Sequence, residues 1–268
     1  MNGRVASLLV GTLVCLSSVI ALGDFAASAA AVVPARPVLA EVGVSAPAAA
    51  SSQAAAPVVR ASVMPVVNVG AVNQSGISAD VLQLAIGAVT CAVNSGDMER
   101  PRTLTVIDYS LPSTEPRLWV FDVETGRLLF KELVAHGRNT GENMAKRFSD
   151  VPESRQSSIG LFVTDETYVG SNGYSLRLDG LEPGFNGRAR ERAIVMHGAP
   201  YVNTSLVSSQ GRIGRSWGCP ALREAIARDV IDTIRGGGVI FSYYPDEEWL
   251  RTSRFLNCGG AERILATN

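Results

Sequence analysis

The sequence predicts a mainly β domain, mostly antiparallel and flanked by two helices, that is exported and held on an N-terminal tether. Three observations lead to this prediction. The 268 residues suffice for one sizeable domain and a tail. Several short runs rich in apolar residues are separated by loops of Gly, Asn and Ser. An uncharged N-terminal run is followed by a stretch composed mainly of Ala, Val, Pro and Ser.

Residues 1–29 have the pattern of a signal peptide. Arg4 precedes an uncharged run over residues 5–22, and Ala27-Ser28-Ala29 has the A-x-A form of a signal peptidase site. The alternative is an uncleaved membrane anchor, because the run approaches the ~18–20 apolar residues that span a bilayer. Both interpretations place the rest of the chain in the periplasm or cell envelope. Membrane contact is expected only through this segment, if it stays uncleaved.

Residues 30–75 are predicted to be a linker. Charge is almost absent there and no hydrophobic period is sustained, so the segment cannot build a core. The folded domain is expected over residues 76–246, with residues 247–268 as a C-terminal tail packed on it.

Two helices and seven strands are predicted within the domain. The first helix follows Ser78, carries apolar residues at helical spacing and ends near Gly96. The second begins at Pro220, because proline is favoured at the first helical position, and ends at Gly236. The predicted strands are residues 103–108, 117–122, 127–136, 159–164, 174–178, 193–197 and 239–244, with a hairpin turn at residues 123–126.

Charge and composition exclude several classes of function. The formal net charge is -1 and no basic patch stands out, which argues against nucleic-acid binding. Two histidines about sixty positions apart and no close cysteine pair match no zinc spacing, so we expect no metal and no cofactor. We expect a monomer.

The cysteines suggest one disulfide and one free thiol. If cleavage removes Cys15, an odd number remains in an oxidising compartment: Cys91, Cys219 and Cys258. A Cys91–Cys258 bridge would join the two ends of the domain and leave Cys219 free. The alternative is that Cys91 and Cys258 are two unpaired structural thiols.

Cys219 is the candidate nucleophile. With Pro220 as the first helical residue, Cys219 becomes the N-cap, and the positive end of a helix dipole lowers the pKa of a thiol. Gly218 permits a tight turn just before it. The N–H groups of Gly218 and Cys219 could then point at a common spot and form an oxyanion hole.

A histidine is needed to take the proton of such a thiol, and two are candidates. His197 ends an apolar strand and is followed by Gly198, so its ring can emerge at a sheet edge. His136 has nearly the same setting. Local sequence alone does not choose between them.

A resemblance to a known family supplies the choice. His197-Gly198, a loop of about twenty residues and Ser216-Trp217-Gly218-Cys219 resemble the signature of L,D-transpeptidase (YkuD-type) catalytic domains. The blocks VIDYSLPSTEPRLWVFD, LVAHGRNTG, SSIGLF, SLRLDGLEPGFN, RAIVMHGAPYV and GRIGRSWGCPAL resemble the murein L,D-transpeptidase subfamily in the same order. Trp217 stands where the broader family has His.

The resemblance implies a β-sandwich-like domain that cuts the L,D bond after the third residue of a peptidoglycan stem peptide. Cys219 would attack that carbonyl and expel D-alanine, His197 would be the general base, and the thioester would pass to an amine of a neighbouring stem. Peptidoglycan stem peptides are therefore the expected partner.

The remaining site residues are expected to orient or bind. Ser216 either orients His197 as part of the catalytic group or holds the turn by hydrogen bonds. Arg215 and Arg212 either meet stem-peptide carboxylates or are solvated surface residues. Trp217 is either a wall of the substrate groove or part of the core. His136 is expected either to line the same cleft or to stabilise its loop. The resemblance alone makes Tyr168 and Tyr174 weaker candidates for the cleft.

Two other functions remain open. Water could accept the acyl group, which gives an L,D-carboxypeptidase or a hydrolase that releases wall-linked groups by the same thioester. A non-catalytic wall-binding module is the third possibility, and the presence of Cys219, His197 and Gly218 argues against it.

Overall fold

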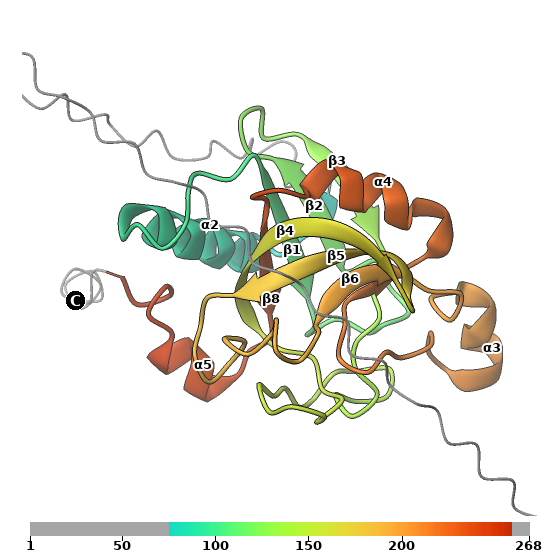
Figure 1. Ribbon diagram of the computed structural model, residues 1–268. Helices are drawn as coiled ribbons and strands as arrows, with labels where there is room; N and C mark the ends of the chain where they lie inside the picture. The colour runs from blue at the N-terminus through green and yellow to red at the C-terminus, as the bar shows by residue number, and fades with distance from the viewer. Residues whose placement is uncertain (1–74, 259–268) are drawn as a thin grey trace, which may run out of the picture. The chain divides into compact units, whose positions relative to one another are not determined.

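The computed structural model describes residues 75–258, which form one eight-stranded sheet with helices packed around it (Figure 1). The predicted signal peptide, residues 30–74 of the predicted linker and residues 259–268 of the tail lie outside the described residues. The strands are β1 (Thr103–Asp108), β2 (Leu118–Asp122), β3 (Leu128–Glu132), β4 (Gly160–Gly170), β5 (Gly173–Gly180), β6 (Val195–Gly198), β7 (Ala221–Leu222) and β8 (Val239–Tyr243). The helices are α2 (Ala79–Asn94), η1 (Thr204–Leu206), α3 (Val207–Gln210), α4 (Glu224–Ile234) and α5 (Glu247–Thr252).

The sheet is mixed, with antiparallel pairs in the majority. Its order is β3-β2-β1-β8-β4-β5-β6-β7. Two neighbouring pairs, β1 with β8 and β6 with β7, are parallel, and the other five are antiparallel. The prediction of a mainly β, mostly antiparallel domain with flanking helices is confirmed.

The two edges of the sheet come together and nearly close it. After β3 the chain runs on to Ala135, whose N–H donates to the carbonyl of Ala221 in β7 at 2.9 Å. This bridge joins the segment that follows β3, at one edge of the sheet, to β7 at the other edge. The expected sandwich-like architecture therefore takes the form of a single curved sheet, and the curvature of β4 and β5 is visible in Figure 1.

Apolar side chains cover both faces of this sheet. The apolar stripe of α2 packs with Trp119, Phe241 and Trp249 in one cluster. Helix α4 packs in a second cluster with side chains such as Phe162 and Met196. Burying a large apolar side chain stabilises a fold by roughly 1.5–3 kcal/mol, so these two clusters fix the sheet on which the site is built.

The second predicted helix begins later than the sequence suggested. Helix α4 starts at Glu224, and its N-cap is Arg223, not Cys219. Residues Ala221–Leu222 form strand β7 instead, paired in parallel with His197–Gly198 of β6. The pairing partner comes from a distant part of the chain, so tertiary contacts override the local preference for a helix after proline.

The boundaries of the predicted strands differ from the observed ones mainly at two places. Strand β3 ends at Glu132, although the strand pattern of the sequence continues to residue 136, because of residues 133–136 only Ala135 forms a bridge. Strand β4 continues to Gly170, past the predicted end at Thr164, through an irregularity between Thr164 and Thr167. Such a bulge lets a strand bend without losing its pairing.

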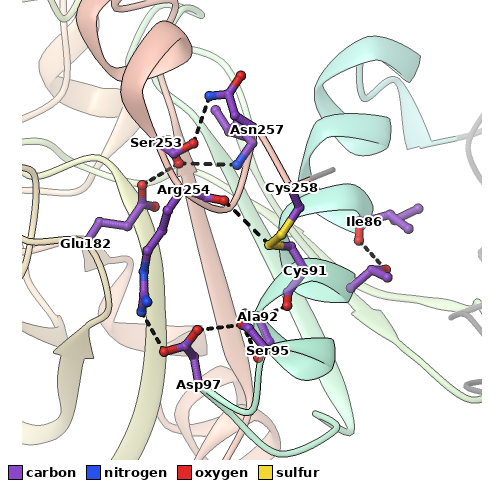
Figure 2. The surroundings of a disulfide bond; sticks show 12 residues. Ile86, Cys91, Ala92, Ser95, Asp97, Glu182, Ser253, Arg254, Asn257 and Cys258 are labelled. Carbon is purple, nitrogen blue, oxygen red and sulfur yellow. Dashed lines mark hydrogen bonds and ion pairs between the residues drawn. A yellow bond between two sulfur atoms is a disulfide. The ribbon is translucent and has the colours of Figure 1, made fainter. Parts of the chain in front are cut away.

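The C-terminal segment is anchored to the domain. Trp249 and Ser253 both donate to the buried carboxylate of Glu182, at 2.9 and 2.6 Å. Arg254 pairs with Asp97 just beyond α2, as Figure 2 shows. The core therefore extends beyond residue 246.

A disulfide joins Cys91 of α2 to Cys258 (Figure 2). Their Cα atoms are 5.9 Å apart and 167 positions separate them in the sequence. Cys219 is a free thiol. The predicted pairing is confirmed.

No helix among residues 75–258 has the length and apolar character needed to cross a membrane.

Removing the disulfide is expected to lower the free energy of unfolding by up to about 5 kcal/mol, because the bridge restricts a very long loop of the unfolded chain. Urea unfolding of the Cys91→Ala/Cys258→Ala variant measures the effect. Cys219→Ala is the control, since it leaves the bridge intact. An unfolding midpoint equal to that of the parent would contradict the prediction.

Candidate active site

The segment Ser216–Cys219 forms a compact turn just before β7. The Ser216 hydroxyl accepts a hydrogen bond from the Gly218 N–H at 3.0 Å and donates to the Cys219 carbonyl at 2.6 Å. Gly218 has φ 131°, and a Cβ atom there would lie 2.8 Å from the carbonyl oxygen of Gln156. Only glycine fits this conformation and this close approach. The turn therefore fixes where Cys219 leaves the backbone.

These bonds agree with one of the two alternatives for Ser216 and differ from the expectation for the Gly218 N–H. The Ser216 hydroxyl holds the turn, and no hydrogen bond among residues 75–258 joins it to His197. The Gly218 N–H already donates to Ser216, so it does not form an oxyanion hole with the Cys219 N–H in this structure.

The Cys219 sulfur lies in a nearly enclosed place. Cys219 is 8% exposed, and its Sγ lies 3.7 Å from the carbonyl oxygen of Ala193. Ala193 has φ 52°, a left-handed conformation that costs energy in a residue with a Cβ and often marks a functional site. The backbone just before β6 is thus bent to meet the sulfur.

The electrostatics of Cys219 differ from the prediction. Burial raises the pKa of the Cys219 thiol, and the N–H groups of Val195 and Cys219 together with the charge of Arg192 oppose that rise only in part. The predicted lowering of the pKa by a helix dipole is wrong, because no helix begins at Cys219. The resting form is a neutral thiol.

Arg192 is the cation that acts on this thiol. Its side chain is 2% exposed. Nη2 donates to the Gln156 carbonyl at 2.7 Å and to the Ser154 hydroxyl at 3.1 Å, and Nη1 donates to the Ser149 carbonyl. These bonds hold the segment of residues 149–158 against the Cys219 turn. Asp150 balances the charge from 4.0 Å.

His197 is a neutral imidazole on β6. Its Nδ1 lies 2.9 Å from the Gly198 carbonyl oxygen, which can only accept, so Nδ1 carries the proton and Nε2 the lone pair. His197 is 4% exposed, and burial lowers its pKa. An imidazole with a free, unprotonated Nε2 has the form that a general base requires.

His197 and Cys219 lie on neighbouring segments of the sheet. His197 faces Ala221 in the parallel β6–β7 ladder, and Cys219 precedes Ala221 by two residues. Cys219 itself lies in the bend that precedes β7. No hydrogen bond among residues 75–258 joins the two side chains. Such bonds often form only once substrate is bound.

Two tyrosines lie within the electrostatic range of the sulfur. Burial and the nearby Cys219 raise the pKa of Tyr201 to about 12. Burial also raises the pKa of Tyr109 to about 12, with a smaller contribution from Cys219. Both phenols are therefore neutral near pH 7 and can serve as hydrogen-bond donors. Neither was singled out from the sequence.

His136 does not line a cleft. It is fully buried, and its Nδ1 lies 2.7 Å from Nη2 of the equally buried Arg117, which can only donate. Nε2 therefore carries the proton and donates to the Gly141 carbonyl at 3.4 Å. Burial and the charge of Arg117 lower the pKa of His136 to about 3. The contacts of His136 do not support substrate binding and agree with the alternative, that it stabilises a loop.

Arg215 and Arg212 are engaged within the protein. Arg215 donates to the carbonyls of Arg138 and Gly141, and to one carboxylate oxygen of Glu142 at 2.7 Å. Arg212 binds the other carboxylate oxygen of Glu142 at 2.8 Å. Both guanidinium groups are paired with the Glu142 carboxylate in this structure.

The two predicted tyrosines make their contacts with other residues than Cys219. Tyr168 stacks beneath the guanidinium of Arg177, and the ladder places it two strands from His197, through Ser175. Tyr174 donates to Asp232 of α4 on the other face of β5. The structure does not bring Tyr174 to the Cys219 turn.

Trp217 is the exposed member of the turn. Its side chain is 70% exposed, and the guanidinium of Arg155 lies over the ring at 4.9 Å from its centre. The core-packing alternative is excluded, since a core tryptophan would be buried. A large apolar surface beside a candidate nucleophile is a suitable wall for a substrate groove.

Sequence reasoning overlooked Arg192 and Tyr201. Both stand in the block RAIVMHGAPYV that carries the resemblance, Arg192 just before the β6 strand and Tyr201 four residues after His197. An arginine directly before a buried strand was the available signal. Its contact with a turn 24 to 27 residues further along the chain could not be seen from the sequence.

Comparison with known proteins identifies the family. The family model described as L,D-transpeptidase catalytic domain matches residues 73–243, more than half of the chain. This chain therefore belongs to the family of L,D-transpeptidase catalytic domains. Among curated proteins, none is similar enough to match it.

Solved L,D-transpeptidase structures are also similar to this chain. LdtMt1, solved in complex with imipenem, is 19% identical over 53% of this chain and 59% of its own, with a TM-score of 0.33. An L,D-transpeptidase from Mycobacterium smegmatis is 16% identical over 54% and 59%, with a TM-score of 0.34. L,D-transpeptidase 3 from Mycobacterium tuberculosis is 13% identical over 54% and 62%, with a TM-score of 0.34. The match spans about three-fifths of the length of these structures.

Proposed function

We propose that this protein is a cysteine-dependent L,D-transpeptidase that cross-links peptidoglycan stem peptides through a thioester on Cys219. The observation that carries the proposal is the turn Ser216–Cys219, which holds a free thiol beside an exposed tryptophan in a domain of this family. Peptidoglycan lies outside the cytoplasm, so the proposal includes export by residues 1–29.

The first half-reaction forms the thioester. Nε2 of His197 takes the proton of the Cys219 thiol as the sulfur attacks the carbonyl of the third stem residue. The carbonyl oxygen becomes negative, and the Cys219 N–H is a candidate donor to it. The tetrahedral species then breaks its C–N bond, and the imidazolium returns the proton to the departing amine of D-alanine. His197 is neutral again, and the acyl group remains on sulfur.

The second half-reaction transfers the acyl group to an amine. The incoming amine attacks the thioester and His197 takes a proton from it. The C–S bond then breaks, and the imidazolium returns that proton to the departing sulfur, which gives an amide, the Cys219 thiol and a neutral His197. Because burial raises the pKa of Cys219 and lowers the pKa of His197, the neutral pair is the resting state. Proton transfer then accompanies attack, and the nearby charge of Arg192 stabilises the sulfur as it becomes negative.

Muropeptide analysis by mass spectrometry tests the function. Cells expressing the intact protein are compared with cells expressing Cys219→Ala, and Tyr174→Phe serves as a control that alters only a hydrogen bond to α4. Dimers joined through third residues, present with the intact protein and Tyr174→Phe and absent with Cys219→Ala, are the expected result. Shortened monomers without dimers would show that water accepts the acyl group, which would overturn cross-linking in favour of hydrolysis. Identical profiles for all three proteins would overturn the proposal as a whole.

A further inference from the structure

A hollow of about 680 Å³ lies next to the Cys219 turn. It is lined by residues of the segment 138–147 and by Arg215. The Arg138 N–H donates to the Ser216 carbonyl at 2.8 Å, and the Cβ position of Gly137 is 3.0 Å from the Cα atom of Gly218. The hollow therefore begins within a few residues of the candidate nucleophile.

Positive charge dominates this hollow. Its lining contains four cations, Arg138, Lys146, Arg147 and Arg215, against the single carboxylate of Glu142. That carboxylate is taken by Arg215 and by Arg212. The three remaining cations are exposed and have no ion pair with a carboxylate of the described residues. The whole chain, in contrast, carries a net charge of -1.

Exposed arginines elsewhere on the domain are often paired. Arg188 binds Glu191, Arg190 binds Asp165 and Asp179, and Arg223 binds Glu132. Unpaired cations gathered in a concave place repel one another, so an anionic group that enters between them relieves that repulsion and gains attraction.

We propose that this hollow is a subsite for a carboxylate of the peptide substrate, bound by Arg138, Lys146 and Arg147 while the scissile carbonyl lies at Cys219. The inference rests on the proposed function, because it assigns the hollow to the same substrate. It transfers the predicted role of carboxylate recognition from Arg215, which is engaged with Glu142, to three cations that the sequence did not single out.

Binding measurements test the subsite without requiring turnover. Isothermal titration calorimetry at low salt uses Cys219→Ala as the parent, and two probes: a synthetic stem tetrapeptide with free carboxylates and the same tetrapeptide with its carboxylates converted to amides. The variant Arg138→Gln/Lys146→Gln/Arg147→Gln removes the subsite charge. The matched control Arg100→Gln/Arg102→Gln/Arg251→Gln removes three exposed charges outside the hollow.

The subsite variant is expected to bind the acidic peptide about tenfold more weakly, since each of three exposed ion pairs contributes between about 1.4-fold and 5-fold. The control variant should bind it nearly as the parent does, and neither variant should change binding of the amidated peptide. Equal weakening by both variants, or no weakening by either, would overturn the inference. If the cysteine proves inactive while this pattern holds, the proposed function fails and the subsite stands.

Discussion

Replacing Arg192 by methionine is expected to lower the free energy of unfolding by about 3–5 kcal/mol and to raise the pKa of the Cys219 thiol still further. Breaking a buried pair leaves its partner uncompensated, here Asp150, and also frees the carbonyls of Ser149 and Gln156. The same change removes the cation, among the described residues, whose charge lowers the pKa of the thiol. Urea unfolding measures the first effect, and the pH profile of Cys219 alkylation by iodoacetamide measures the second.

Two further variants separate charge from packing. Arg192→Lys keeps the positive charge but cannot make the hydrogen bonds of both guanidinium Nη atoms. The pKa of Cys219 measured by alkylation should therefore stay close to that of the parent, while the free energy of unfolding falls. Arg190→Gln removes an exposed arginine two positions earlier and should change the free energy of unfolding by no more than about 1 kcal/mol. An alkylation profile that is the same in Arg192→Met and in the parent would show that Arg192 does not act on the sulfur.

Lowering the pH from 6.5 towards 3 is expected to remove up to about 5 kcal/mol of unfolding free energy through His136 alone. The pKa of His136 falls from 6.5 to about 3 in the folded state, because of burial and the charges of Arg117 and Arg215. Between these values the unfolded chain binds a proton that the folded chain does not, so stability decreases as the pH falls. The contribution is complete above pH 6.5 and lost by about pH 3.

The variant His136→Gln supplies the comparison. Glutamine can accept from Arg117 and donate to the Gly141 carbonyl, yet it does not titrate. Urea unfolding of both proteins at a series of pH values should show the parent losing stability more steeply between pH 6.5 and pH 3. Parallel curves would mean that His136 takes up its proton in the folded state as readily as in the unfolded one.

Local sequence patterns predicted a strand well where the strand's own residues have a clear preference for extended, buried structure. β1 covers residues 103–108 as predicted, because a run of β-branched residues buried on both faces suits a central strand. The error at residues 220–223 has a different origin. Ala221–Leu222 read as the start of an amphipathic helix, and only their pairing with His197–Gly198 makes them a strand. Local sequence contains no pattern that predicts a strand of two residues.

The sequence predicted which residues form the candidate site, but it did not predict their pKa values. Cys219 and His197 follow from motif and resemblance, and the structure places them on neighbouring segments of the sheet. The surroundings that set their pKa values could not be derived, because they depend on contacts between segments far apart in the chain. Arg192 and Tyr201 come near Cys219 only after the sheet has formed. The dipole effect that local sequence suggested is missing because no helix begins at Cys219, and burial raises the pKa of the thiol instead.

The three tryptophans of this chain differ sharply in their exposure. Trp119 and Trp249 are fully shielded, whereas the indole of Trp217 stands in solvent two residues before the sulfur. A soluble quencher such as iodide therefore reaches only one fluorophore. The molecule carries an intrinsic optical reporter at the mouth of its site, and the rate at which any acyl group arrives at or leaves Cys219 can be followed by light without a label.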